Sequence, residues 1–132
     1  MVRGRYSDCS TSQARTRLGH AELYLDVARL VLADETGSES TVATRNAVLA
    51  GIAAADAICC AAVGKRYRGA DHREAAAYLE RVTGEQKLGQ ALRDLADYKD
   101  GAHYGLANVK TQRARAATRR AELLVRAARD RV

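Results

Sequence analysis

The run AVLAGIAAADAICCAAV at residues 47–63 constrains the fold more than any other stretch of this sequence, because it is apolar nearly all the way round a helix. A helix without a polar face lies at the centre of a bundle. Its residues are mostly Ala, Gly and Cys, so neighbouring backbones can approach it closely. Because the run is rich in alanine and interrupted by Asp56, we interpret it as a core helix and not as a membrane span.

The rest of the chain has the composition of an all-helical protein. Its 132 residues include no proline, much Ala and Arg, and few β-branched residues. Apolar residues recur at helical spacing in five segments, namely 11–35, 41–63, 71–82, 88–105 and 108–132. The short connections favour antiparallel neighbours. The sequence therefore predicts one domain over residues 1–132, an all-α up-down bundle of about five helices with a loose lead-in over residues 1–11.

Two further expectations concern helix ends and faces. In the first helix the buried stripe of Leu18, Ala21, Leu25, Ala28 and Leu32 is predicted to be widened by three neighbours, Tyr24, Leu30 and Val31. Asp71 is a candidate N-cap for the third helix and Asn108 for the fifth.

The three cysteines, Cys9, Cys59 and Cys60, make neither a metal-ligand pattern nor a disulfide framework. We expect them to be small core residues of a protein in the reducing cytoplasm. Residues 1–12 are polar and do not resemble a signal peptide. The sequence carries no glycine-rich phosphate loop, no Cys/His ligand spacing and no serine nucleophile motif. It therefore predicts no metal and no cofactor.

The positive charge is concentrated at one end of the chain. The formal net charge is +6, and residues 107–132 carry eight bases against two acids, which accounts for the whole excess. Such a helix can meet the phosphate backbone of a nucleic acid, with Arg113 and Arg120 as candidate contacts. A solvated helix face is the other interpretation, and charge alone favours it.

The fourth helix carries the candidate catalytic residues. Its leucine stripe of Leu88, Leu92 and Leu95 continues into Lys99 and His103. An ammonium group on such a face needs a partner charge, a solvent-filled cleft or a second subunit. A plainer interpretation is that His103 is an ordinary helix-terminal histidine and that Lys99 pairs with Asp56 or Asp100.

Two other polar residues invite a choice of interpretation. A carboxylate in the central helix, Asp56, needs a cation or several donors. It either belongs to a structural buried pair, the interpretation we favour, or orients Lys99 or His72. His72 lies in the first turn of the third helix, where an exposed structural role competes with a binding role.

Two segments, AGIAAADAICCAAVGKRYRGADHREAAAYL and ALRDLADYKDGAHYG, carry a resemblance to the HEPN family of helical domains. The order and lengths of the helices resemble that family over almost the whole chain. In active members an Arg is followed, after four to six residues, by a His. His103 matches the His, whereas the Arg positions hold Ala96, Asp97 and Tyr98. The resemblance implies metal-independent cleavage of RNA at a cleft between two copies of the domain.

In such a site His103 would act as acid or base and Lys99 would stabilise the phosphorane charge. Tyr104 would donate to a phosphate oxygen, and Asp100 would supply the polar residue near the motif. The candidate binding residues around this centre are Arg93, His72, Asp56, Arg113 and Arg120.

The resemblance also implies partners. It suggests a cytoplasmic homodimer that binds RNA within a toxin–antitoxin or defence system, with a cognate antitoxin or another partner protein and no membrane. Since the motif Arg is absent, the sequence leaves open whether the protein is an enzyme. The alternative is a catalytically inactive HEPN-like module that binds a partner protein or a nucleotide through the same cleft.

Overall fold

The structure is an all-α bundle, as the sequence predicts. It is a computed structural model that describes residues 5–33, 38–104 and 109–132, and the side chains of all of these except residues 38 and 99–104. Of the described residues, 83% are helical, and they form five helices: α1 (Thr11–Leu32), α2 (Ser38–Val63), α3 (His72–Thr83), α4 (Gln86–Tyr104) and α5 (Thr111–Arg131).

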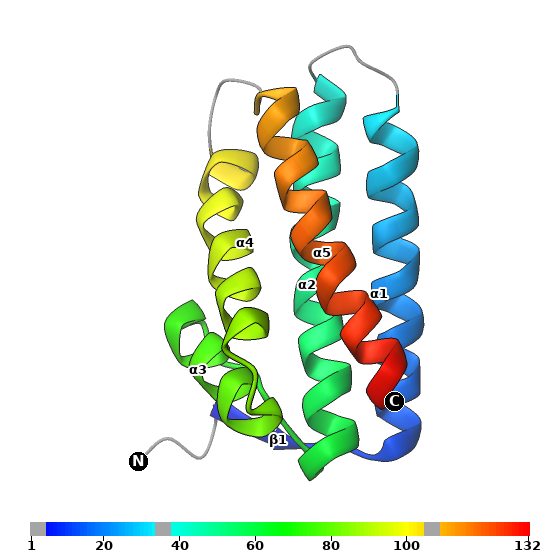
Figure 1. Ribbon diagram of the computed structural model, residues 1–132, viewed down its shortest axis with the longest axis vertical. Coiled ribbons are helices and arrows are strands. Elements are labelled where there is room, and N and C mark those ends of the chain that lie inside the picture. Colours follow the sequence, from blue (N-terminus) through cyan, green and yellow to red (C-terminus); the bar gives the residue numbers. More distant parts are fainter. Residues whose placement is uncertain (1–4, 34–37, 105–108) are drawn as a thin grey trace.

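Four long helices lie side by side and alternate in direction, and the short α3 packs beside the first half of α4 (Figure 1). The apolar helix α2 is central, since it packs against α1, α4 and α5. By length and composition its segment Glu39–Val63 could cross a membrane, but 67% of an apolar 18-residue stretch within it is buried inside the bundle, as expected for a core helix.

Small residues on α2 let its neighbours approach closely. Gly51 shows this best: a Cβ atom added there would overlap Cδ1 of Leu95 on α4 and lie 3.2 Å from Cδ1 of Leu124 on α5. Both leucine side chains are fully buried and have little room to move. The close packing of α4 and α5 against α2 therefore depends on the absence of a side chain at position 51.

Of the two predicted N-caps, one is confirmed and the other is not. Asp71 is the N-cap of α3, as predicted, and its side chain accepts hydrogen bonds from the backbone N–H groups of Arg73 and Glu74. The fifth helix begins after Lys110, whose side chain makes no capping bond. The prediction of Asn108 as this cap is therefore wrong, because the N-cap residue is Lys110; Asn108 itself lies outside the described residues.

The described part of the lead-in is ordered, contrary to our expectation for residues 1–11. Strand β1 (Tyr6–Asp8) pairs antiparallel with β2 (Lys65–Tyr67), which follows α2. The backbone N–H of Arg68 donates to the carbonyl of Arg5 at 2.6 Å. This two-stranded ribbon crosses the base of the bundle (Figure 1).

The expectation of three unpaired core cysteines is wrong. Cys9 and Cys60 form a disulfide that joins the segment after β1 to the end of α2. Sequence spacing could not indicate it, because 51 residues separate the two cysteines and the partner segment had no predicted structure. Cys59 has an unpaired thiol and is buried, as expected. Burial raises the pKa of this thiol to about 12.

One face of α1 also differs from the prediction. Leu30 was expected to widen the buried stripe but is 76% exposed. It lies on the outer face with Leu23 and Val27, which are also exposed. The buried residues of α1 are Ala14, Ala21, Leu25 and Ala28, so the inner stripe is narrower than predicted.

Candidate functional site

A polar cleft of about 630 Å³ lies between the start of α3 and the middle of α4. The α3 side is formed by the capping turn and the α4 side by three successive turns. The lining residues are Ala70, Asp71, His72, Arg73, Gln90, Arg93, Ala96 and Asp97. Two of the predicted binding residues, His72 and Arg93, are therefore brought into one cleft from segments that are distant in the sequence.

The predicted catalytic residues follow this cleft along α4. Lys99 and Asp100 belong to the turn after Asp97, and His103 and Tyr104 to the last turn of the helix. The side chains of these four residues lie outside the described residues. What the structure establishes is their place on the backbone of α4, beyond the end of the cleft.

His72 is half-buried, and not the exposed first-turn histidine of the plainer interpretation. It lines both the cleft and a smaller cavity of about 90 Å³. Its position is fixed by the cap before it, because the hydroxyl of Tyr67 accepts a hydrogen bond from the backbone N–H of Asp71 at 3.1 Å. The ribbon and the N-cap together hold His72 in the lining of the cleft.

An ion pair between the two helices holds Arg93 against the wall of the cleft. Its Nη1 donates to Oε1 of Glu80 on α3 at 2.6 Å. Both side chains are about one-third exposed, so solvent and a ligand can reach them. The sequence prediction included Arg93 but missed Glu80, which carried no signal beyond its place on a helix.

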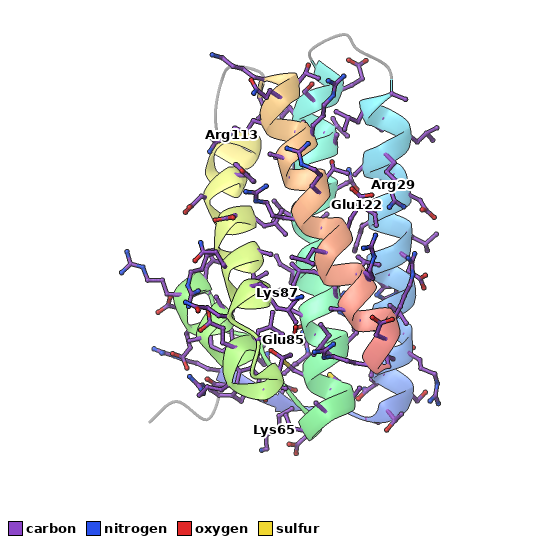
Figure 2. The ribbon with its side chains drawn as sticks, viewed as in Figure 1. Arg29, Lys65, Glu85, Lys87, Arg113 and Glu122 are labelled. Atoms are coloured by element: carbon purple, nitrogen blue, oxygen red, sulfur yellow. A yellow bond between two sulfur atoms is a disulfide. The ribbon has the colours of Figure 1, made fainter. Side chains whose placement is uncertain are left out.

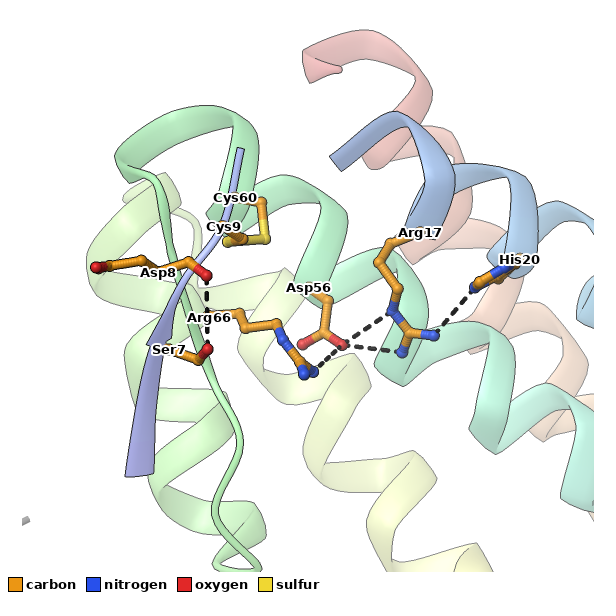
Figure 3. A network of polar contacts seen from close by, with 8 residues as sticks. All are labelled: Ser7, Asp8, Cys9, Arg17, His20, Asp56, Cys60 and Arg66. Atoms are coloured by element: carbon orange, nitrogen blue, oxygen red, sulfur yellow. Dashed lines mark hydrogen bonds and ion pairs between the residues drawn. A yellow bond between two sulfur atoms is a disulfide. The ribbon is translucent and has the colours of Figure 1, made fainter. Parts of the chain in front are cut away.

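Asp56 belongs to a buried ion network, which supports the structural interpretation. Its Oδ2 accepts from Nε and Nη2 of Arg17 at 3.1 and 2.9 Å, and from Nη1 of Arg66 at 3.2 Å. Figure 3 shows the two arginines reaching this carboxylate from α1 and from β2. Burial raises the pKa of Asp56 above its usual value, and the two guanidinium charges counter that rise.

The arginines of α5 are largely used in contacts with other helices. Arg113 stacks over the ring of Tyr98 on α4 at 4.6 Å, and Nε of Arg120 donates to Oδ2 of Asp94 at 3.0 Å. Nε of Arg129 contacts Glu22 of α1 at 2.8 Å. Figure 2 shows a further pair between α5 and α1, Glu122 and Arg29. These pairs cross-link the bundle and agree with a solvated, structural basic helix.

A shallower groove of about 300 Å³ runs along the opposite side of α4, towards α5. Gln90 lines both the groove and the cleft. The groove also contains three bases, Lys87, Arg119 and Arg120. The exposed ridge of α4 therefore has basic side chains on both sides, accompanied by Asp71 and Asp97 in the cleft and by Asp94 in the groove.

Among the residues that the structure describes, no group of three or more His, Cys, Asp or Glu side chains is placed to hold a metal ion. Comparison of the chain with protein-family models and with curated proteins gives no match. The HEPN resemblance therefore depends on the sequence segments and helix order given above.

Proposed function

We propose that this protein binds RNA as a HEPN-like homodimer of a toxin–antitoxin or defence system, with α4 as the helix that meets the RNA. The observation that carries the proposal is the cleft between α3 and α4. It presents His72 and Arg93 next to the turn that leads to Lys99 and Asp100. Arginine on the wall of a polar cleft suits a phosphate group, because its planar fork offers several donors to one anion.

The chemistry proposed for the end of α4 is metal-independent cleavage of the RNA backbone. Such a reaction needs a base for the 2′-hydroxyl, an acid for the leaving oxygen and a cation for the charge that develops on phosphorus. A homodimer would bring two copies of His103 to one site, so the same residue type could serve as base and acid. Lys99 would supply the cation, while Tyr104 and Asp100 would position the phosphate.

Basic side chains on both sides of α4 support binding of a polyanion. Arg73 and Arg93 belong to the cleft, and Arg119 and Arg120 belong to the groove. Arg113 stacks on Tyr98 just before Lys99. Contacts of this kind position a nucleic acid without reading its sequence.

We further propose that the protein works in the cytoplasm, where its RNA substrate is found. The Cys9–Cys60 disulfide must be reconciled with that compartment. Stable disulfides belong to oxidising compartments, and those of cytosolic proteins are usually transient and redox-sensing. A cytoplasmic protein with this bond would therefore alternate between an oxidised and a reduced form.

The proposal is tested with purified protein and a labelled single-stranded RNA at low salt. We expect the wild type to retain the RNA on a filter and to cleave it in the presence of EDTA. His103→Ala should abolish cleavage while retention persists, because the basic contacts remain. If the wild type neither retains nor cleaves RNA, the proposal is wrong. If it retains RNA that no condition cleaves, the protein is the catalytically inactive interaction module.

A matched control separates the cleft from general charge. Arg15 is exposed on α1 and does not line the cleft or the groove. Arg15→Gln removes the same charge as Arg93→Gln. RNA retention should fall with Arg93→Gln and stay near the wild-type value with Arg15→Gln.

A further inference from the structure

A second polar cleft, of about 360 Å³, lies at the base of the bundle, and the disulfide forms part of its wall. It lies between β1, the first turns of α1 and the end of α2. Its lining includes Cys9, Cys60, Gln13, Thr16, Arg17 and Arg66. The disulfide is therefore next to hydrogen-bonding side chains and two guanidinium groups (Figure 3).

The charges around this cleft do not cancel. Arg17 and Arg66 share a single carboxylate, that of Asp56. Asp8, which also lines the cleft, is paired with Lys65 at 3.1 Å. These five groups leave one positive charge in excess. A small anion entering the cleft would meet two arginine side chains that are partly exposed to solvent.

We propose that this cleft admits a small thiol that carries a carboxylate, and that this thiol reduces the Cys9–Cys60 disulfide and releases β1 from β2. Of the two cysteines, Cys9 is half-exposed, whereas Cys60 is buried. The incoming thiol therefore meets Cys9. Its carboxylate is attracted by the excess positive charge of Arg17 and Arg66.

The reduction consumes two molecules of the thiol. The thiolate of the first attacks Sγ of Cys9 and forms a mixed disulfide. The Cys9–Cys60 bond breaks, and its electron pair leaves with Sγ of Cys60, which takes up a proton. The second thiolate attacks the sulfur of the first, and Sγ of Cys9 leaves and is protonated in turn. The protein gains two electrons and two protons, and the two small thiols become one disulfide.

The neighbouring Cys59 does not compete in this exchange. It is adjacent to Cys60 in the sequence but is buried. Because burial holds its pKa near 12, it stays a protonated thiol at physiological pH. Thiolates and not thiols attack disulfides, so an external thiol is needed to open the bond.

Loss of the disulfide leaves β1 weakly held. The ribbon consists of two strands of three residues each, and isolated two-stranded ribbons are marginal in water. Beyond the strand pairing, the β1 segment is held by the Asp8–Lys65 ion pair and by a hydrogen bond from the backbone N–H of Cys9 to the carbonyl of Gly64. Tyr6 adds ring contacts with Tyr67 and Tyr78 and a hydrogen bond from its hydroxyl to Glu74 on α3. Release of β1 would therefore also free one contact of α3.

The test measures the rate at which three small thiols reduce the oxidised full-length protein. The thiols are 3-mercaptopropionate, 2-mercaptoethanol and cysteamine, which carry a carboxylate, no charge and an ammonium. Each rate is divided by the concentration of the thiolate form. It is then divided by the rate at which the same thiol reduces 2-hydroxyethyl disulfide, an uncharged reference. At low salt one charge at about 6 Å changes such a rate roughly threefold. We expect 3-mercaptopropionate to react about threefold faster than 2-mercaptoethanol, and 2-mercaptoethanol about threefold faster than cysteamine.

Substitutions and added salt test whether the difference in rate among the three thiols arises in the cleft. Arg66→Gln should remove most of the difference among the thiols, Arg66→Lys should preserve it, and Arg15→Gln on the outer surface of α1 should leave it unchanged. Should Arg66→Gln fail to fold, about 0.5 M salt must abolish the order in the wild type, because it screens charges beyond a few ångströms. Equal rates for all three thiols, or equal effects of Arg66→Gln and Arg15→Gln, would overturn the proposed site.

Release of β1 has its own readout. Amide hydrogen exchange is compared between the oxidised protein and the protein reduced by 3-mercaptopropionate. We expect the amide of Arg68, which donates to Arg5 across the ribbon, to exchange at least tenfold faster after reduction. An amide in the middle of α2, such as that of Ile58, should not change. Unchanged exchange at Arg68 would show that β1 stays paired and that reduction has no structural consequence.

Discussion

Nη1 of Arg93 on α4 lies 2.6 Å from Oε1 of Glu80 on α3, and Arg93, but not Glu80, lines the cleft between the two helices. The pair has two possible uses. It can hold α3 against α4, or it can keep an arginine in position until an anion replaces the carboxylate. Because the two side chains are partly exposed, the pair contributes on the order of 1 kcal/mol or less to folding stability, so its substitution leaves the fold intact.

Substitution of each partner should affect RNA binding in a different direction. Arg93→Gln removes a phosphate contact, so the dissociation constant for single-stranded RNA should rise severalfold. The slope of the logarithm of the binding constant against the logarithm of the salt concentration should become smaller in magnitude by about 0.7. Glu80→Gln frees the arginine, so binding should stay equal or become tighter. Fluorescence anisotropy at several salt concentrations measures both. If Glu80→Gln weakens binding as much as Arg93→Gln does, the pair is only structural.

The Asp56 network should be important for stability. Asp56→Asn leaves Arg17 and Arg66 without their shared carboxylate. Removal of one partner of a buried pair costs about 3–5 kcal/mol, and we expect about 2–3 kcal/mol because both arginines are partly solvated. Urea denaturation measures the loss.

The control is Asp26→Asn. Asp26 is 68% exposed and pairs with Arg29 at 3.9 Å, so its removal should cost less than about 0.5 kcal/mol. A similar small loss for Asp56→Asn would show that the buried network contributes little to the free energy of unfolding.

The helical part of this fold could be read from the sequence, because it follows from periodicity. The apolar run of α2 and the leucine stripe of α4 are local patterns. Asp71 could be predicted as an N-cap because Asp is one of the few residue types preferred there. The partners of Asp56 could not be predicted from the sequence, because Arg17 and Arg66 belong to two other segments of the chain. The sequence shows that a buried carboxylate needs a cation, but only the packing shows which one.

The ribbon and the disulfide were missed for a similar reason. A strand of three residues is too short to show a period, and Cys9 finds Cys60 only because β1 lies across the end of α2. Of the candidate site, His72 and Arg93 were predicted and are brought together. The side chains of Lys99 and His103 lie outside the described residues, so their roles stay predictions.

Cys59 should make stability depend on alkaline pH. Its pKa of about 12 in the folded protein exceeds the ordinary value of 9.0. The native state therefore holds this proton more tightly. The stability it contributes is complete below pH 9 and falls as the pH rises towards 12. At pH 10.5 the loss should be about 2 kcal/mol.

The measurement compares proteins with and without Cys59→Ala by urea denaturation at pH 8 and pH 10.5. Both carry Cys9→Ser and Cys60→Ser, which avoids disulfide exchange. Between pH 8 and pH 10.5, the free energy of unfolding should fall by about 2 kcal/mol more in the protein that retains Cys59 than in its Cys59→Ala counterpart. Equal losses would show that the thiolate of Cys59 is tolerated in the folded state.

Two helical glycines should respond oppositely to alanine. At Gly51 a Cβ would overlap the buried Leu95, so Gly51→Ala should destabilise the protein by about 1–3 kcal/mol. At Gly19 a Cβ meets nothing within 4 Å, so Gly19→Ala should stabilise α1 by about 0.5–1 kcal/mol. Thermal or urea denaturation of the two variants and the wild type measures both changes in stability. Stabilisation by Gly51→Ala would contradict the close packing of α2 against α4.

The proposed homodimer brings two copies of the end of α4 together. Its most direct test is the distance between spin labels attached at position 103 in the two subunits, in protein with His103→Cys and Cys59→Ala. The control places the labels instead at Leu23→Cys, on the exposed face of α1.

We expect a dimer in which the labels at position 103 lie within about two helix diameters, roughly 20–25 Å, and the labels at position 23 lie much farther apart. A monomer at the labelling concentration, or a dimer in which position 23 gives the short distance and position 103 the long one, would contradict it.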